Sequence, residues 1–164
     1  MKSFLKKEQK VFYVKALNDL TQVETAIDMI RRNVDTEIEL SILGKLSHDE
    51  FNNKKILVKK RRALRTYWHE HMDKKTDIGF FFHPEIGQIY IIGPLVPMFL
   101  YDVSGKKLGA LTGGTYGILR GFGIGPKETM DFLNILDKGS YLLILKGYKK
   151  PLSRVENLLN KLNL

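Results

Sequence analysis

The sequence predicts an α+β domain in which strands and helices follow the ferredoxin-like order β-α-β-β-α-β, with a basic helix, a glycine-rich segment and a C-terminal helix added. Short runs of β-branched and aromatic residues alternate with stretches whose apolar residues recur every three or four positions. The 164 residues suit one domain, residues 1–164, and 43% apolar with 27% charged residues is typical of a globular protein.

The first elements form a strand–helix–strand unit. Residues 10–16 (KVFYVKA) are predicted to form a buried strand, and residues 36–43 (TEIELSIL) alternate as a half-buried strand does. Between them, Thr21 and Glu24 have the spacing of a capping box. The helix that follows would bury one apolar face made of Val23, Ile27 and Ile30.

A long basic helix is predicted within residues 47–75. Ser47 and Glu50 form a second possible capping box, and the helix is expected to end near Met72. Nine basic and two acidic residues lie between Lys54 and Lys75, so this window carries most of the net charge of +9. Its apolar stripe consists of Leu57, Leu64, Trp68 and Met72.

A hairpin is predicted next, with strands at residues 78–82 and 88–92 joined by the turn His83-Pro84-Glu85-Ile86-Gly87. After the glycine-rich segment, residues 105–125, Pro126 favours the first turn of a helix that runs to about Leu136. The inward residues of this helix are expected to be Met130, Leu133 and Leu136.

Residues 140–146 (SYLLILK) are the most strand-like run of the chain. Pro151 is expected to open the last helix, with Ser153 and Glu156 as its cap. Its predicted buried stripe is Val155, Leu158, Leu159 and Leu162. The resulting sheet would be antiparallel, with helices on one face and the other left for the basic helix, the C-terminal helix or a second copy of the chain.

Four glycines of the glycine-rich segment recur every four residues: Gly109, Gly113, Gly117 and Gly121. Three interpretations stay open, namely a flexible connection, a close-packing groove against another helix or subunit, and an anion site before a helix N-terminus. The residues of the last interpretation are Gly121, Gly123, Gly125 and Lys127. The Lys-Ser/Thr ending of a P-loop is absent.

The second half of the chain combines Gly93-Pro94-Leu95 with residues 109–124 (GALTGGTYGILRGFGI) and residues 139–144. Over residues 92–146, this pattern is similar to the bacterial heat-induced or general stress family. The resemblance implies a ferredoxin-like fold with a glycine-zipper insertion and no known catalytic residues. The chain departs from the family in its short glycine segment, which Arg120 interrupts, and in its basic helix, so a membrane role does not carry over.

No catalytic set, metal site or cofactor is predicted from the residues. The chain has no cysteine, which excludes thiolate ligands and a cysteine nucleophile and suits a cytoplasmic protein. On a helix, His69 and His71 would lie on opposite sides and could not share a metal. His48 suggests no role, and His83 is interpreted as a turn residue.

Three functions follow from these features. The first is non-enzymatic self-association, as a dimer, or partner binding through the open sheet face and the glycine groove. The second is binding of nucleic acid or an anionic membrane surface by the basic helix, without a transmembrane span, through Lys55, Lys59, Lys60, Arg61, Arg62 and Arg65. The third is binding of a phosphorylated ligand before the helix at Pro126.

Overall fold

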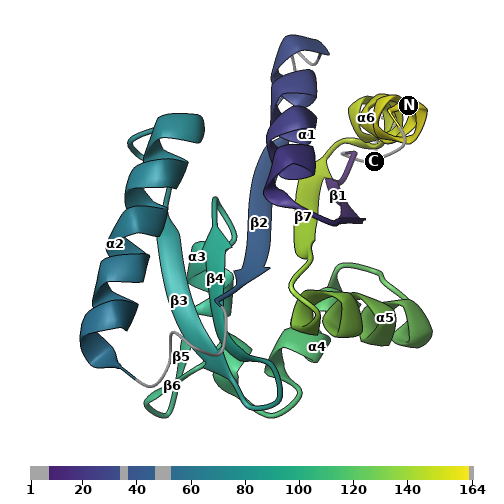
Figure 1. Ribbon diagram of the computed structural model, residues 1–164. Helices are drawn as coiled ribbons and strands as arrows, with labels where there is room; N and C mark the ends of the chain where they lie inside the picture. The colour runs from purple at the N-terminus through teal and green to yellow at the C-terminus, as the bar shows by residue number, and fades with distance from the viewer. Residues whose placement is uncertain (1–7, 34–36, 47–52, 163–164) are drawn as a thin grey trace, which may run out of the picture.

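The protein folds around one five-stranded antiparallel sheet, as the computed structural model shows for residues 8–33, 37–46 and 53–162 (Figure 1). The α+β class is thereby confirmed. β1 and β3 form the two edges of the sheet. The order across the sheet is β1 (Val11–Leu17), β7 (Tyr141–Gly147), β2 (Glu39–Lys45), β4 (Gly87–Ile92) and β3 (Ile78–His83).

The predicted strands share this sheet. β1 lies against β7, with Val11 opposite Gly147 and Leu17 opposite Tyr141, and β3 and β4 form the predicted hairpin. Every neighbouring pair is antiparallel. The ferredoxin-like order is not confirmed, because the five predicted strands all join the sheet and the β-α-β-β-α-β order has four.

Helices cover both faces of the sheet, so the expectation of an open face is wrong for the described residues. α1 (Leu20–Asn33), α2 (Lys54–His71) and α6 (Lys149–Lys161) pack on the face that Leu143 and Leu145 of β7 reach. The face of Leu142 and Ile144 is covered by α3 (Val96–Phe99), α4 (Gly114–Gly121) and α5 (Pro126–Asp137). Burial on both sides explains why residues 41–44 of β2 are all buried instead of alternating.

The cap of α1 differs from the expected one. Asp19 accepts a hydrogen bond from the backbone N–H of Gln22 at 2.9 Å, and the Gln22 side chain accepts one from the Asn18 N–H at 2.8 Å. The capping box therefore stands two residues before Thr21, which leaves Glu24 available for a contact with α2.

The start of α6 also differs, because the helix begins at Lys149 and places Ser153 within it. Neither Ser153 nor Glu156 is its cap. Its buried residues are Leu152, Val155 and Leu159, whereas Leu162 is exposed. The second predicted capping box, at Ser47 and Glu50, lies outside the described residues.

The glycine-rich segment is neither one helix nor one loop. After a small hairpin of β5 (Asp102–Val103) and β6 (Lys106–Lys107), a 3₁₀ turn spans Leu108–Ala110 and α4 follows. Gly109 packs against the ring of Phe81, and Gly113 has a positive φ of 71° just before α4. The four glycines therefore do not line one helical groove. Only Gly117 and Gly121 lie on α4, with open space above them, and their role as a contact surface stays a prediction.

α5 buries a face that matches the predicted one only in part, because Leu136 is buried as predicted and Leu133 packs partly buried against the core. Its buried residues are Thr129, Phe132 and Leu136, whereas Met130 is 47% exposed.

The outer edge of β3 has a specific neighbour, because the Lys107 ammonium group donates a hydrogen bond to the Phe80 carbonyl oxygen at 2.6 Å.

Two glycines of α4 should respond oppositely to alanine. A methyl group on Gly114 would overlap the carbonyl oxygen of Leu108, which is backbone and cannot move aside easily. We expect Gly114→Ala to lower the free energy of unfolding by about 1–3 kcal/mol, and Gly117→Ala, which meets no atom within 4 Å, to raise it by about 0.5–1 kcal/mol. Urea denaturation measures both values, and a stabilising Gly114→Ala would contradict the packing described for α4.

Candidate functional site

α2 packs one face against the sheet and exposes the other to solvent. Asn53 caps its N-terminus by accepting a hydrogen bond from the Lys55 N–H at 2.9 Å. Trp68 is fully buried in the core, and Leu57 and Leu64 pack partly buried beside it. The predicted apolar stripe therefore attaches α2 to the sheet.

The C-terminal half of α2 is bound to α1. The Arg31 guanidinium donates to the carbonyl oxygens of His71 at 2.7 Å and Met72 at 2.8 Å, where a helix leaves acceptors unsatisfied. The Tyr67 hydroxyl donates a hydrogen bond to Glu24. Burial and this hydrogen bond raise the pKa of Tyr67. These contacts fix α2 in position, so its outer side chains project from a rigid support.

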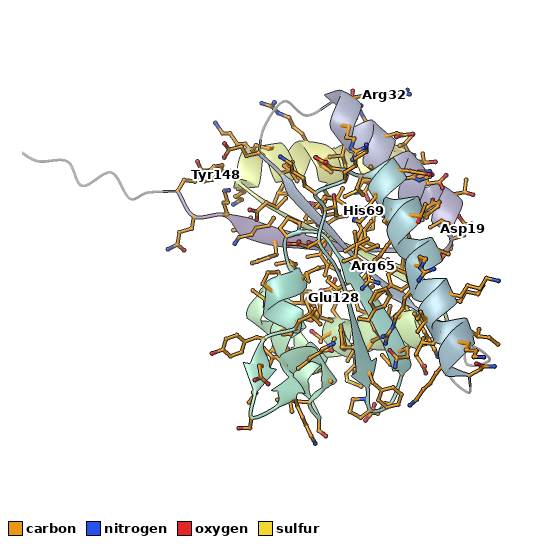
Figure 2. The ribbon with its side chains drawn as sticks, turned by 90° about the vertical axis from the view of Figure 1, so that its left-hand side faces the viewer. Asp19, Arg32, Arg65, His69, Glu128 and Tyr148 are labelled. Atoms are coloured by element: carbon orange, nitrogen blue, oxygen red, sulfur yellow. The ribbon has the colours of Figure 1, made fainter. Side chains whose placement is uncertain are left out.

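A row of cations follows the outer face of α2. Lys55, Lys59 and Arg62 are exposed at four- and three-residue steps, which places them along one side of the helix. None of the three has a carboxylate partner within the described part of the chain. Figure 2 shows nitrogen-tipped side chains extending from α2 away from the sheet.

Two further cations of α2 converge on one aromatic ring. The guanidinium carbons of Arg61 and Arg65 lie 4.9 Å and 5.1 Å from the centre of the Phe80 ring. Arg61 also donates to the Gln88 side chain at 3.3 Å, but its buried Nε has no hydrogen-bond partner among the described residues. Burial and the neighbouring charge of Arg65 lower the pKa of Arg61. Two like charges are thus held together beside β3, and no carboxylate of the described residues forms an ion pair with either of them.

The remaining predicted residues lie in different places. Lys60 lines a groove of about 420 Å³ between α2 and the strands β2, β4 and β7, together with Tyr67 and Trp68, so it is not part of the outer row. At the start of α5, Pro126 at the first helical position has no N–H to offer.

The glycines before α5 and Lys127 are exposed, and nothing lies within 4 Å of a Cβ position on Gly121, Gly123 or Gly125. Glu128 already places a negative charge in the first turn of the helix. It competes with any anion there, because both would interact with the same positive end of the helix dipole. Anion binding at this turn stays a prediction.

The histidines make no metal site. His48 lies outside the described residues, His69 Nε2 is 3.1 Å from the Thr76 carbonyl oxygen, and His71 stacks on Tyr67 with ring centres 4.1 Å apart. Within residues 8–33, 37–46 and 53–162, no group of three histidine or carboxylate side chains could hold a metal ion.

His83 has a more specific environment than a turn residue requires. It is 6% exposed, and its Nδ1 accepts hydrogen bonds from the backbone N–H groups of Glu85 and Ile86, each at 3.1 Å. Burial lowers its pKa, although the charges of Glu85 and Asp137 act in the opposite direction. His83 is therefore neutral near pH 7, with its proton on Nε2. The sequence signals only a turn here, because these contacts depend on the folded backbone.

No family model, curated protein or solved structure matches the chain. The resemblance to the general stress family gains no support from these comparisons. In the part of the chain that the structure describes, each helix is too short or too polar to cross a membrane.

The neutral state of His83 should make part of the stability depend on pH. The pKa of His83 in the folded state lies below the ordinary 6.5. As the pH falls below 6.5, His83 binds more protons in the unfolded chain than in the folded one, so the free energy of unfolding decreases. This decrease ends once the pH is below the folded-state pKa of His83. His83→Asn retains an acceptor for the turn but does not titrate. We expect the free energy of unfolding, measured by urea denaturation, to fall more in wild type than in His83→Asn as the pH is lowered. A pH-independent difference would contradict this assignment.

Proposed function

We propose that the protein binds nucleic acid by its phosphates, with the outer face of α2 as the contact surface. The observation that carries this proposal is the row of Lys55, Lys59 and Arg62, which is exposed, rigidly supported and without a carboxylate partner in the described residues. Neutralising phosphates with such side chains releases counterions, which supplies most of the affinity of non-specific nucleic-acid binding.

The pair above Phe80 supports the same proposal. Arg61 and Arg65 repel one another, and a phosphate placed between them would relieve this repulsion. The Nε of Arg61, which has no hydrogen-bond partner in the described residues, adds a buried donor. The cations of α2 therefore extend from its outer face to the flank beside β3.

An exposed aromatic ring favours single-stranded nucleic acid. Phe82 is 55% exposed on β3 and lies directly across the strand pair from Gln88, which accepts the hydrogen bond from Arg61. A ring beside cations offers a surface on which a base can stack whatever its sequence. Paired bases in a duplex are not free to stack in this way.

The packing of α2 argues against insertion into a membrane surface. An amphipathic helix that binds lipid does so with its apolar face, but Leu57, Leu64 and Trp68 of α2 are used within the fold. Only Ile56 and Val58 are large apolar residues exposed on this helix. Contact with lipid headgroups by charge alone is left as the competing outcome.

Self-association through α4 is a second proposal. Its support is the exposed surface at Gly117 and Gly121, where no atom lies within 4 Å of a Cβ position and another backbone can approach closely. The sheet faces no longer support self-association, because helices cover both of them.

Removing the outer row should weaken nucleic-acid binding and its dependence on salt. We expect the variant Lys55→Gln/Lys59→Gln/Arg62→Gln to bind a labelled oligothymidylate of about 20 nucleotides more weakly, because three phosphate contacts are lost. The slope of log K against log salt should decrease in magnitude by about 2. Fluorescence anisotropy between about 50 and 200 mM salt measures both quantities.

A matched control changes the same charge elsewhere. Lys149, Lys150 and Lys161 are exposed on α6, beside the opposite half of the sheet, and their triple Gln variant should retain most of the affinity. Equal losses in the two variants would show that net charge alone attracts the oligonucleotide and would overturn the assignment to α2. Binding to phosphatidylserine vesicles but not to the oligonucleotide would overturn the choice of nucleic acid.

A further inference from the structure

A cavity of about 300 Å³ lies away from α2, on the α4–α5 side of the sheet. One wall is the β3–β4 turn with His83 and Ile86, and another is the segment at Gly113 that leads into α4. The third wall is α5. Three separate segments thus converge on one hollow, which is typical of a small-molecule site.

The apolar part of the cavity is formed by residues of α5 and of the β3–β4 turn. Met130, which the sequence places in the core, lines this cavity instead, and Leu133 lines the cavity while it packs partly buried against the core. Together with Ile86, they provide an apolar surface for the body of a ligand. Met130 is flexible and can adapt to the shape of that body.

His83 contributes a donor that has no partner among residues 8–33, 37–46 and 53–162. Its Nδ1 accepts both turn hydrogen bonds, so Nε2 carries the proton, and no group in the described residues bonds to Nε2. The side chain is buried apart from the 6% of its surface that remains exposed, and it lines the cavity. An N–H at the wall of a cavity can donate a hydrogen bond to a ligand that presents an oxygen acceptor.

The charge in the cavity is negative, unlike that of the protein as a whole. Glu85 and Asp137 line it, and no lysine or arginine of the described residues does. The Asp137 carboxylate is partly neutralised by Lys45 at 2.9 Å, whereas Glu85 has no ion-pair partner in the described part of the chain. A phosphorylated or carboxylate ligand would be repelled here.

We propose that this cavity binds a small organic cation, with an ammonium or amidinium group at the Glu85 and Asp137 carboxylates. The apolar or aromatic body of the ligand lies against Met130 and Leu133, and an ether or carbonyl oxygen accepts the proton of His83 Nε2. This binding site does not depend on nucleic-acid binding by α2, since the two surfaces share no residue.

Three probes of one shape test the charge requirement: 4-methoxybenzylamine, 4-methoxybenzyl alcohol and 4-methoxybenzoate. We expect the amine to shift the backbone amide NMR signals of residues around the cavity, the alcohol to bind more weakly and the benzoate not to bind. Glu85→Gln should weaken binding of the amine about threefold, which is the effect of losing one exposed ion pair. Equal binding of amine and benzoate, or signal shifts elsewhere, would overturn the proposal.

The His83 contact has its own test. Comparison of 4-methoxybenzylamine with benzylamine isolates the oxygen acceptor, and His83→Asn removes the Nε2 donor while keeping an acceptor for the turn. We expect the methoxy compound to bind better than benzylamine in wild type and equally well in the variant. An unchanged preference in a variant that retains the wild-type NMR spectrum outside the turn would overturn the role given to His83.

The variant with weakened oligonucleotide binding tests whether the cavity binds its ligand independently of α2. Lys55→Gln/Lys59→Gln/Arg62→Gln should bind the amine as wild type does. Loss of amine binding in this variant would place the probe on α2 instead of in the cavity and would overturn the proposal, whatever happens to oligonucleotide binding.

Discussion

The fold depends on burial of the middle strands from both sides. In β7, residues 142–145 are at most 1% exposed, although successive side chains point to opposite faces. Each fully buried leucine or isoleucine stabilises the fold by about 1.5–3 kcal/mol, so both faces require a cover. α1, α2 and α6 supply one cover, and the segments from α3 to α5 supply the other.

This constraint separates the two proposed surfaces. α2 uses its apolar stripe to cover the first face, which leaves its cations outside and without carboxylate partners in the described residues. On the second face, α5 buries Phe132 and Leu136 and leaves Met130 beside the β3–β4 turn. The positive row and the acidic cavity thus lie on helices that cover opposite faces of the sheet. The two proposed ligands therefore bind at separate surfaces.

The sequence predicts the strands well because their residues carry local signals. The runs at residues 10–16 and 140–146 lie in β1 and β7 with ends displaced by one residue, and Pro126 begins α5 as expected. Two parts of the second cover are missed, because α3 has four residues and α4 has eight, too few for an apolar period to be visible.

Of the candidate sites, the outer row of α2 is visible in the sequence because the spacing of Lys55, Lys59 and Arg62 is itself helical. The spread of the other cations is not visible. Nothing local indicates that Arg61 and Arg65 meet over Phe80, or that Lys60 lines the groove between α2 and the sheet. The cavity at His83 joins residues from turn, loop and helix, and so depends on the tertiary fold.

The hydrogen bond from Lys107 to the Phe80 carbonyl oxygen limits what can join the sheet at β3. An incoming strand would first have to displace the Lys107 ammonium group from an acceptor on that edge. Growth of the sheet into a larger aggregate is therefore opposed at this edge by one lysine.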